Sequence, residues 1–162
     1  MNIIHPDLHF IIEHVYKKFD HKFTNFQNEA ESSEYGACTY TLNNELIKFR
    51  VAKITPTKVG QFVTFWKRNS IGETTPHTSS DLFDLAIISV RKEKLLGHFI
   101  FPKSALISHG LISHLTQTGK RGFRVYPSWD RPINTQGIKT QKWQLDYFYD
   151  VDNLSAFLEH FK

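Results

Sequence analysis

Basic side chains are concentrated in the middle of the chain, where they are able to bind phosphate groups. Residues 48–142 contain 16 Lys and Arg and 5 Asp and Glu, a net charge of +11, whereas the flanking segments contain 4 basic and 11 acidic residues, a net charge of −7. A basic centre between acidic ends makes a positive face available, and such a face attracts phosphates. The candidates for phosphate contacts are Lys53, Lys58, Lys67, Arg68, Lys103, Lys120, Arg121, Arg124 and Lys142.

Aromatic residues are interleaved with these cations. Trp66 precedes Lys67, and Trp143 follows Lys142. Unpaired bases stack on such rings, so Trp143 joins the candidate binding residues. Two alternatives stay open at this point: the cations could form the solvated face of a basic protein, and the tryptophans could pack in the core.

The segment from Lys120 to Arg124 has the pattern of a short strand that begins with cations. Alternation along a strand places Arg121 and Phe123 on one face and Arg124 on the other. At least one of the two arginines should therefore face solvent on the basic side of the protein.

Other chemical motifs are incomplete. Cys38 is the one cysteine, which excludes an internal disulfide framework and a cysteine-based zinc site. His109 and His114 are five residues apart, which is not the one-turn spacing of a helical metal-binding pair. Residues 119–122 lack the earlier glycine and the following Ser or Thr of a phosphate-binding loop. The residues therefore indicate no metal site and no cofactor.

The elements that must position these residues are short strands and helices in one domain, residues 1–162. We expect strands at residues 35–42, 46–54, 60–66, 83–90, 97–102 and 122–126. We expect helices at residues 7–20, 104–110 and 140–149, and a final helix after Asp152. Residues 24–34, 69–80 and 127–137 have the composition of loops.

The fold class follows from three of these segments. A turn at Asn43 and Asn44 joins two strands into the clearest hairpin, since Ile47, Phe49 and Val51 alternate with basic residues. The apolar run at 83–90 is typical of a buried central strand, and Ser104 is placed to cap a helix. The pattern predicts an α/β or α+β fold, with a mixed or antiparallel sheet and helices at both ends of the chain.

The location of the protein is predicted from what its apolar segments lack. The first residues contain no basic stretch followed by an apolar run, as a signal peptide would. Every apolar run is too short to cross a bilayer. A single cysteine is typical of a reducing compartment. We therefore expect a cytoplasmic protein with no membrane partner.

Three long stretches carry a family resemblance. They read EYGACTY (34–40) with FRVAKITPTKVGQFVTFWKR (49–68), DLAIISVRK (84–92) with GHFIFPK (97–103), and GKRGFRVYPSWD (119–130) with TQKWQL (140–145). These runs resemble the MepB family of bacterial cytoplasmic proteins, whose best-known member is encoded beside a multidrug efflux pump. The resemblance implies a restriction-endonuclease-like core, with a mixed, mostly antiparallel sheet and flanking helices, and nucleic acid as the partner. It implies no established catalytic residues.

Folds of that kind often carry a Mg²⁺-dependent nuclease site, which needs two acids and a lysine. Asp84 and Lys103 supply the first acid and the lysine, but Phe101 stands where the second acid belongs. Glu34 and Lys53 form a second such pair, in which Val51 replaces the acid. We favour the first placement, because a helix and then a strand follow Lys103. In both cases the metal motif is incomplete.

The hypothesis from the sequence is a cytoplasmic protein that binds DNA or RNA through a basic face, on an endonuclease-like fold without an intact metal site. One alternative is an enzyme, a Mg²⁺-dependent nuclease whose missing acid is supplied by Glu34 or Asp130. Another is a non-enzymatic module whose basic face binds an acidic protein or a small anion.

Overall fold

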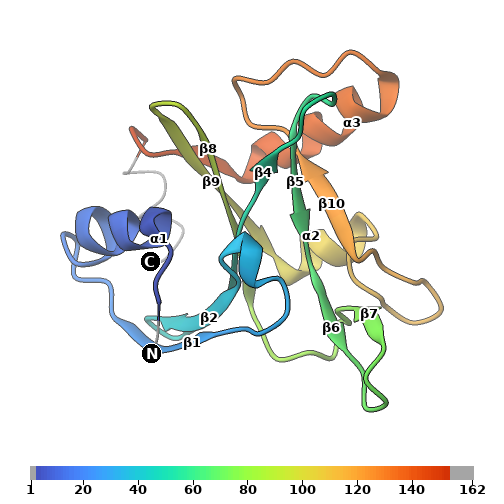
Figure 1. Ribbon diagram of the computed structural model, residues 1–162, viewed down its shortest axis with the longest axis horizontal. Helices are drawn as coiled ribbons and strands as arrows, with labels where there is room; N and C mark the ends of the chain where they lie inside the picture. The colour runs from blue at the N-terminus through green and yellow to red at the C-terminus, as the bar shows by residue number, and fades with distance from the viewer. Residues whose placement is uncertain (1–2, 154–162) are drawn as a thin grey trace.

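The computed structural model describes residues 3–153, and a six-stranded mixed sheet forms its centre (Figure 1). The strand order is β1-β2-β3-β8-β9-β11. The strands are β1 (Phe23–Asn28), β2 (Cys38–Leu42), β3 (Glu45–Val51), β8 (Leu85–Lys92), β9 (Leu95–Pro102) and β11 (Phe148–Asp150). Neighbours are antiparallel except β3 and β8, which are parallel. The mixed, mostly antiparallel sheet expected from the sequence is therefore confirmed.

The chain between β3 and β8 forms most of a second layer. A three-stranded antiparallel sheet has the order β10-β5-β4, and a two-stranded sheet pairs β6 with β7. Their bounds are β4 (Lys53–Ile54), β5 (Gln61–Thr64), β6 (Trp66–Arg68), β7 (Thr74–Pro76) and β10 (Gly122–Val125). In Figure 1 the three-stranded sheet lies on one side of β8 and β9, and the first helix lies on the other.

Three α-helices and three short helical segments accompany the sheets within residues 3–153. They are α1 (Pro6–Ile11), α2 (Lys103–Ser108) and α3 (Thr135–Gln144), the π-helical η1 (Ile12–Tyr16), and the 3₁₀ segments η2 (Ser33–Tyr35) and η3 (Leu145–Tyr147). None of the helices within residues 3–153 is long and apolar enough to span a membrane.

The core has two parts, one on each face of the six-stranded sheet. On the first face, Leu8 and Val15 of the N-terminal helix pack over Phe49 and Ile87. On the second face, residues of β5 and β10 pack over Ile88, Phe99 and Phe101. Strand β8 contributes to both parts because its alternate side chains point to opposite faces. The prediction of a buried central strand at 83–90 is thus confirmed.

A buried ion pair lies on the second face. Arg50 of β3 is fully buried, and its Nη1 donates to Glu29 Oε1 at 2.8 Å and to the carbonyl of Phe49 at 2.9 Å. The guanidinium lies 5.3 Å from the centre of the Phe65 ring. Lys48 Nζ also donates to Glu29, at 3.3 Å. The single carboxylate of Glu29 is therefore shared by the charges of Arg50 and Lys48.

Several expected elements are confirmed. Strands β2 and β3 form the hairpin across Asn43 and Asn44. Strand β9, helix α2 and strand β10 follow one another in the expected order. The predicted cap of α2 is wrong, because Pro102 rather than Ser104 occupies that position. The helix expected after Asp152 falls mostly outside the described residues.

Two segments expected to be loops contain strands. Residues 23–28 form β1, an edge strand whose polar residues face outward while Phe23 packs 4.7 Å from the ring of Tyr40. Residues 74–76 form β7, which pairs with β6. Both strands are at sheet edges, where one partner is enough and the apolar alternation of a central strand is not required.

The last α-helix begins earlier than expected. We predicted a loop to residue 137 and a helix at 140–149, but α3 starts at Thr135, and β11 occupies residues 148–150. Asn134 caps the helix by accepting a hydrogen bond from the Gly137 backbone N–H at 2.6 Å. Asparagine is a favoured cap, and this signal is partly hidden by the glycine and prolines around it.

Candidate functional site

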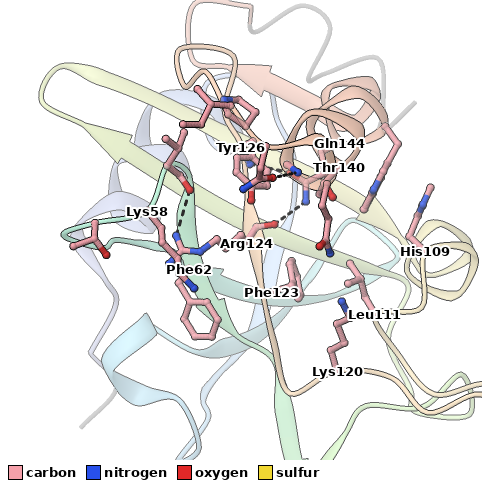
Figure 2. Close-up of a pocket in the computed structure, with 18 residues that line it drawn as sticks. Lys58, Phe62, His109, Leu111, Lys120, Phe123, Arg124, Tyr126, Thr140 and Gln144 are labelled. Atoms are coloured by element: carbon pink, nitrogen blue, oxygen red, sulfur yellow. Dashed lines mark hydrogen bonds between the residues drawn. The ribbon is translucent and has the colours of Figure 1, made fainter.

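A hollow of about 730 Å³ lies between α3, the turn from β4 to β5, and the chain that leads into β10 (Figure 2). We call it the groove. Its lining residues are Thr57, Lys58, Val59, Phe62, His109, Leu111, Lys120, Phe123, Arg124, Tyr126, Pro132, Ile133, Asn134, Gln136, Gly137, Thr140, Trp143 and Gln144. Figure 2 shows Lys58 and Arg124 toward one side and His109 and Lys120 toward the other.

The Arg124 side chain is held at the edge of the groove by the β4–β5 turn. Its Nη2 donates to Thr55 Oγ1 at 2.8 Å, and its Nη1 lies 3.4 Å from the carbonyl oxygens of Val59 and Gly60. The guanidinium also lies 5.9 Å from the centre of the Phe62 ring, on the neighbouring strand β5. Its neutral partners leave the positive charge of Arg124 unbalanced.

Gln144 joins α3 to β10 on the far wall. The side chain is 1% exposed, its Nε2 donates to the Arg124 carbonyl at 2.9 Å, and its Oε1 accepts from the Tyr126 N–H at 2.9 Å. These bonds satisfy two backbone groups at the end of β10 that would otherwise be buried without partners. The helix is thereby fixed against the strand that carries Arg124.

The N-terminal end of α3 faces the groove. Gln136, Gly137, Thr140 and Gln144 all line it, and their spacing places them along one side of the helix. The N-terminus of a helix carries a partial positive charge. Gly137 permits the close approach of this end, since a Cβ there would lie 2.9 Å from Pro132 Cβ.

Positive charge in the groove has no acidic counterpart. Lys58, Lys120 and Arg124 line it, and the lining residues include no Asp or Glu in the described part of the chain. Within residues 3–153, none of these three cations forms an ion pair. The groove is therefore suited to anions, and its aromatic walls are suited to flat rings.

Two aromatic rings stack at the end of the groove. The His109 and Trp143 rings are 3.7 Å apart and nearly parallel, at 4°. Trp143 also contacts the ring of Phe101 and packs against the core, whereas His109 is exposed. Partial burial lowers the pKa of His109 from its ordinary value. Trp143 therefore packs against the core, as one of the two alternatives expected, and also lines the groove.

The structure brings together only some of the cations that the sequence nominates. Lys58, Lys120, Arg124 and Trp143 share the groove. Lys67 pairs with Asp81 at 2.6 Å, and Arg68 pairs with Glu31 at 2.8 Å. The positive charge of these two side chains is already balanced within the protein.

The other nominated cations lie outside the lining of the groove. Lys53 Nζ is 4.7 Å from the centre of the Tyr35 ring, and Lys142 is exposed on α3. Arg121 donates to the Thr74 side chain and carbonyl, at 3.2 and 3.0 Å. Arg121 is exposed and Phe123 is buried, so the prediction that they share a face is wrong. Arg121 precedes the first residue of β10, where alternation begins.

The acidic residues considered for a metal site have other positions. Asp84 Oδ2 accepts from the Leu46 N–H at 2.8 Å, and the Lys103 ammonium donates to the carbonyls of Ser79 and Asp81. Phe101 is fully buried, and Glu34 is exposed in η2. Residues 3–153 contain no group of three or more His, Cys, Asp or Glu that could hold a metal ion.

A second hollow of about 470 Å³ adjoins the groove, and we call it the side hollow. It is lined by Ile54, Pro56, Thr57, Lys58, Val59, Gly60, Gln61, Lys92, Trp129, Asp130 and Arg131. Thr57, Lys58 and Val59 line both hollows and form the ridge between them. Burial raises the pKa of Asp130, and the charge of Lys92 opposes that shift.

Sequence reasoning did not nominate several residues of these hollows. Tyr126, Asn134 and Gln144 line the groove, and Lys92 and Arg131 line the side hollow. Lys92 and Arg131 belong to the basic central segment and were detectable by charge alone. Gln144 had no signal of its own, because its role depends on the position of α3 beside β10.

Comparisons with known proteins agree with this architecture. The family model described as MepB-like matches residues 29–150, a range that includes both hollows. A solved structure, described as the crystal structure of MepB, is similar with a TM-score of 0.79 and 33% sequence identity. The match covers 84% of this chain and 93% of that chain. The comparison with curated proteins gave no match. By the extent of the family match and by the identity to MepB, the chain belongs to the MepB-like family.

Proposed function

We propose that the protein binds nucleic acid through phosphate contacts in the groove. The observation that carries the proposal is the set of three cations, Lys58, Lys120 and Arg124, that line a groove whose described lining residues include no carboxylate. Cations without an internal carboxylate partner are available to a phosphate, whereas Lys67 and Arg68 must first leave Asp81 and Glu31. The N-terminus of α3 adds a favourable dipole for the same anion.

The proposal has two further parts that follow from the family resemblance. One is a restriction-endonuclease-like core, supported by a mixed sheet with flanking helices. The other is a cytoplasmic location, supported by the single cysteine. Nucleic acid would be accessible to the protein in that compartment.

The test is the salt dependence of binding to a fluorescently labelled oligonucleotide, measured by anisotropy. Each phosphate contact adds about 0.7 to 0.9 to the slope of log affinity against log salt. Lys58→Gln and Lys120→Gln should each lower that slope by about that amount and weaken binding roughly fivefold at low salt. Lys67→Gln and Arg68→Gln should have smaller effects, since their charges are paired.

Lys139→Gln is the matched control, because Lys139 is exposed on α3 and lines neither hollow. Equal losses in Lys58→Gln and Lys139→Gln would mean that only net charge matters and would overturn the groove as the site. Binding that is absent at low salt, or that does not weaken as salt rises, would overturn the proposed function. Inorganic phosphate that competes as well as the oligonucleotide would favour the small-anion alternative.

The proposal is one of binding without cleavage. The Asp84 carboxylate already accepts a backbone hydrogen bond, and buried Phe101 supplies no second carboxylate beside it. In the same experiment, the oligonucleotide should remain intact when Mg²⁺ or Mn²⁺ is added. Cleavage that disappears in Asp84→Ala would replace this proposal with the nuclease alternative.

A further inference from the structure

We infer that the ligand is an unpaired nucleic-acid strand, which lies with its phosphates on the Thr57–Val59 ridge and places neighbouring bases in the groove and the side hollow. The inference rests on the proposed function and names the class of nucleic acid. The two hollows are adjacent, since the three ridge residues line both. Lys58 lies on the ridge and is therefore within reach of a strand that crosses from one hollow to the other.

The size and shape of the hollows favour single bases over a duplex. Volumes of about 730 and 470 Å³ are in the range of pockets that enclose small molecules. A duplex keeps its bases stacked inside, and a base enters a protein pocket only after it leaves the stack. An unpaired strand presents its bases without that cost. Concave sites on each side of a cationic ridge therefore match a single strand.

The groove offers an aromatic platform for a base. His109 lies flat on Trp143 and is exposed, so the outer face of its ring is open to solvent. The Trp143 ring covers the inner face of the His109 ring and itself contacts the ring of Phe101. Bases stack on such rings with little dependence on sequence. Arg124 and Lys120 line the same groove, where they can contact the phosphate of the stacked nucleotide.

The side hollow has unused hydrogen-bonding capacity next to it. Gln61 is 1% exposed, and its Oε1 accepts no hydrogen bond from any residue between 3 and 153. Trp129 Nε1 likewise has no acceptor in that part of the chain. Buried polar atoms without partners are uncommon in proteins. Both residues line the side hollow, and both atoms are buried, so contact with the donor and acceptor groups of a base edge requires these side chains to turn toward the hollow. Lys92 and Arg131 line the same hollow and are available to the next phosphate.

The experiment compares strands of equal length and label by anisotropy at one low salt concentration. An unstructured single strand should bind at least tenfold more tightly than a hairpin duplex. Affinity should rise steeply from one to three thymidine nucleotides, as both hollows fill. His109→Ala should weaken single-strand binding about fivefold or more, since one stacking contact is lost. Trp129→Phe keeps the ring but removes the donor, and it should weaken the trinucleotide more than the mononucleotide.

Each outcome bears on one of the two proposals. Equal or tighter binding of the duplex, with the losses in Lys58→Gln and Lys120→Gln retained, overturns this inference and leaves the proposed function standing. A mononucleotide that binds as tightly as the trinucleotide overturns the path across the ridge. No binding of either form at low salt overturns the proposed function itself. Circular dichroism melting curves of His109→Ala and Trp129→Phe establish that any loss is not one of folding.

Discussion

The stability of the fold depends on how the buried charge of Arg50 is balanced. Its side chain is fully buried, and of its three nitrogens only Nη1 has a hydrogen-bond acceptor within residues 3–153. Glu29 supplies the balancing charge at 2.8 Å, from the chain that follows β1. A buried charge whose partner is removed is strongly destabilising, even when the pair itself adds little to stability.

Glu29→Gln should therefore lower the free energy of unfolding by about 3 kcal/mol at neutral pH. Burial raises the pKa of Glu29, but the charges of Arg50 and Lys48 outweigh burial and hold that pKa below its ordinary value. The stabilisation from a depressed carboxyl pKa is present above about pH 4.5 and is lost as the pH falls below it. Urea denaturation at several pH values should show the variant and the native protein converge in acid.

The control for this variant is Glu13→Gln. Glu13 forms an ion pair with Lys17 at 2.7 Å, but both side chains are substantially exposed. Exposed pairs of this kind contribute little to stability, because solvent screens their charges. A loss in Glu29→Gln no larger than that in Glu13→Gln would show that Arg50 does not depend on its carboxylate partner.

At the scale of elements, α3 determines the shape of the groove. Its N-terminal turn packs closely on the preceding loop, and a Cβ at position 137 would lie 2.9 Å from Pro132 Cβ and 3.0 Å from Asn134 Oδ1. Alanine normally stabilises a helix by about 1 kcal/mol relative to glycine. Here the added methyl group collides with the residue that caps the helix.

Gly137→Ala should therefore destabilise the protein by about 1 to 2 kcal/mol and speed backbone hydrogen exchange in the first turn of α3. Lys139→Ala, in the same helix and exposed, should be neutral or slightly stabilising. The comparison is made by thermal unfolding and by hydrogen exchange. A stabilised Gly137→Ala variant would mean that the loop yields to the methyl group without loss of the cap.

The elements that the sequence predicts correctly are those whose residue pattern lies within one short segment. The β2–β3 hairpin follows from alternation and an Asn-Asn turn, and β8 follows from its continuous apolar run. Strand β1 was missed because an edge strand buries only part of one face. The start of α3 was missed because proline and glycine around Asn134 resemble a loop.

Part of the candidate site is also predictable, because the clustering of cations is visible within a segment of the sequence. Clustering of cations in the sequence indicated a positive face, and Lys58, Lys120 and Arg124 do share the groove. The sequence does not reveal which cations are neutralised. Arg68 and Glu31 are 37 residues apart along the chain, and only the packing of β6 beside the loop after β1 brings them within 2.8 Å.

At the scale of the whole molecule, two buried histidines add to the loss of stability in acid. His77 and His98 are each 2% exposed. Burial lowers the pKa of His98 to about 4. Burial, together with the charges of Lys48 and Arg50, lowers the pKa of His77 to about 4, although Asp81 opposes the shift. Both imidazoles are therefore neutral in the folded protein throughout the range in which unfolded histidine titrates.

The free energy of unfolding should fall as the pH decreases from about 6.5 to about 4. In that range the unfolded chain binds protons at these two positions and the folded protein does not, so protonation favours unfolding. The loss approaches the order of 3 kcal/mol for each histidine at the lower end. Urea titrations should show a shallower pH dependence for His98→Gln than for the native protein. A native curve that is flat between these pH values would contradict the prediction.

The parallel pairing of β3 with β8 has a consequence for the order of folding. The β2–β3 and β8–β9 hairpins each join strands that are close in sequence, and such hairpins form within microseconds. Strand β3 can pair with β8 only when the intervening residues 52–84 form a loop between them. Pairing of segments that are distant in sequence slows folding. That loop carries the Thr57–Val59 ridge, which lies between β4 and β5, and Phe62 of β5, which also lines the groove. The slow pairing of β3 with β8, which completes the six-stranded sheet, is therefore also the step that positions this side of the groove.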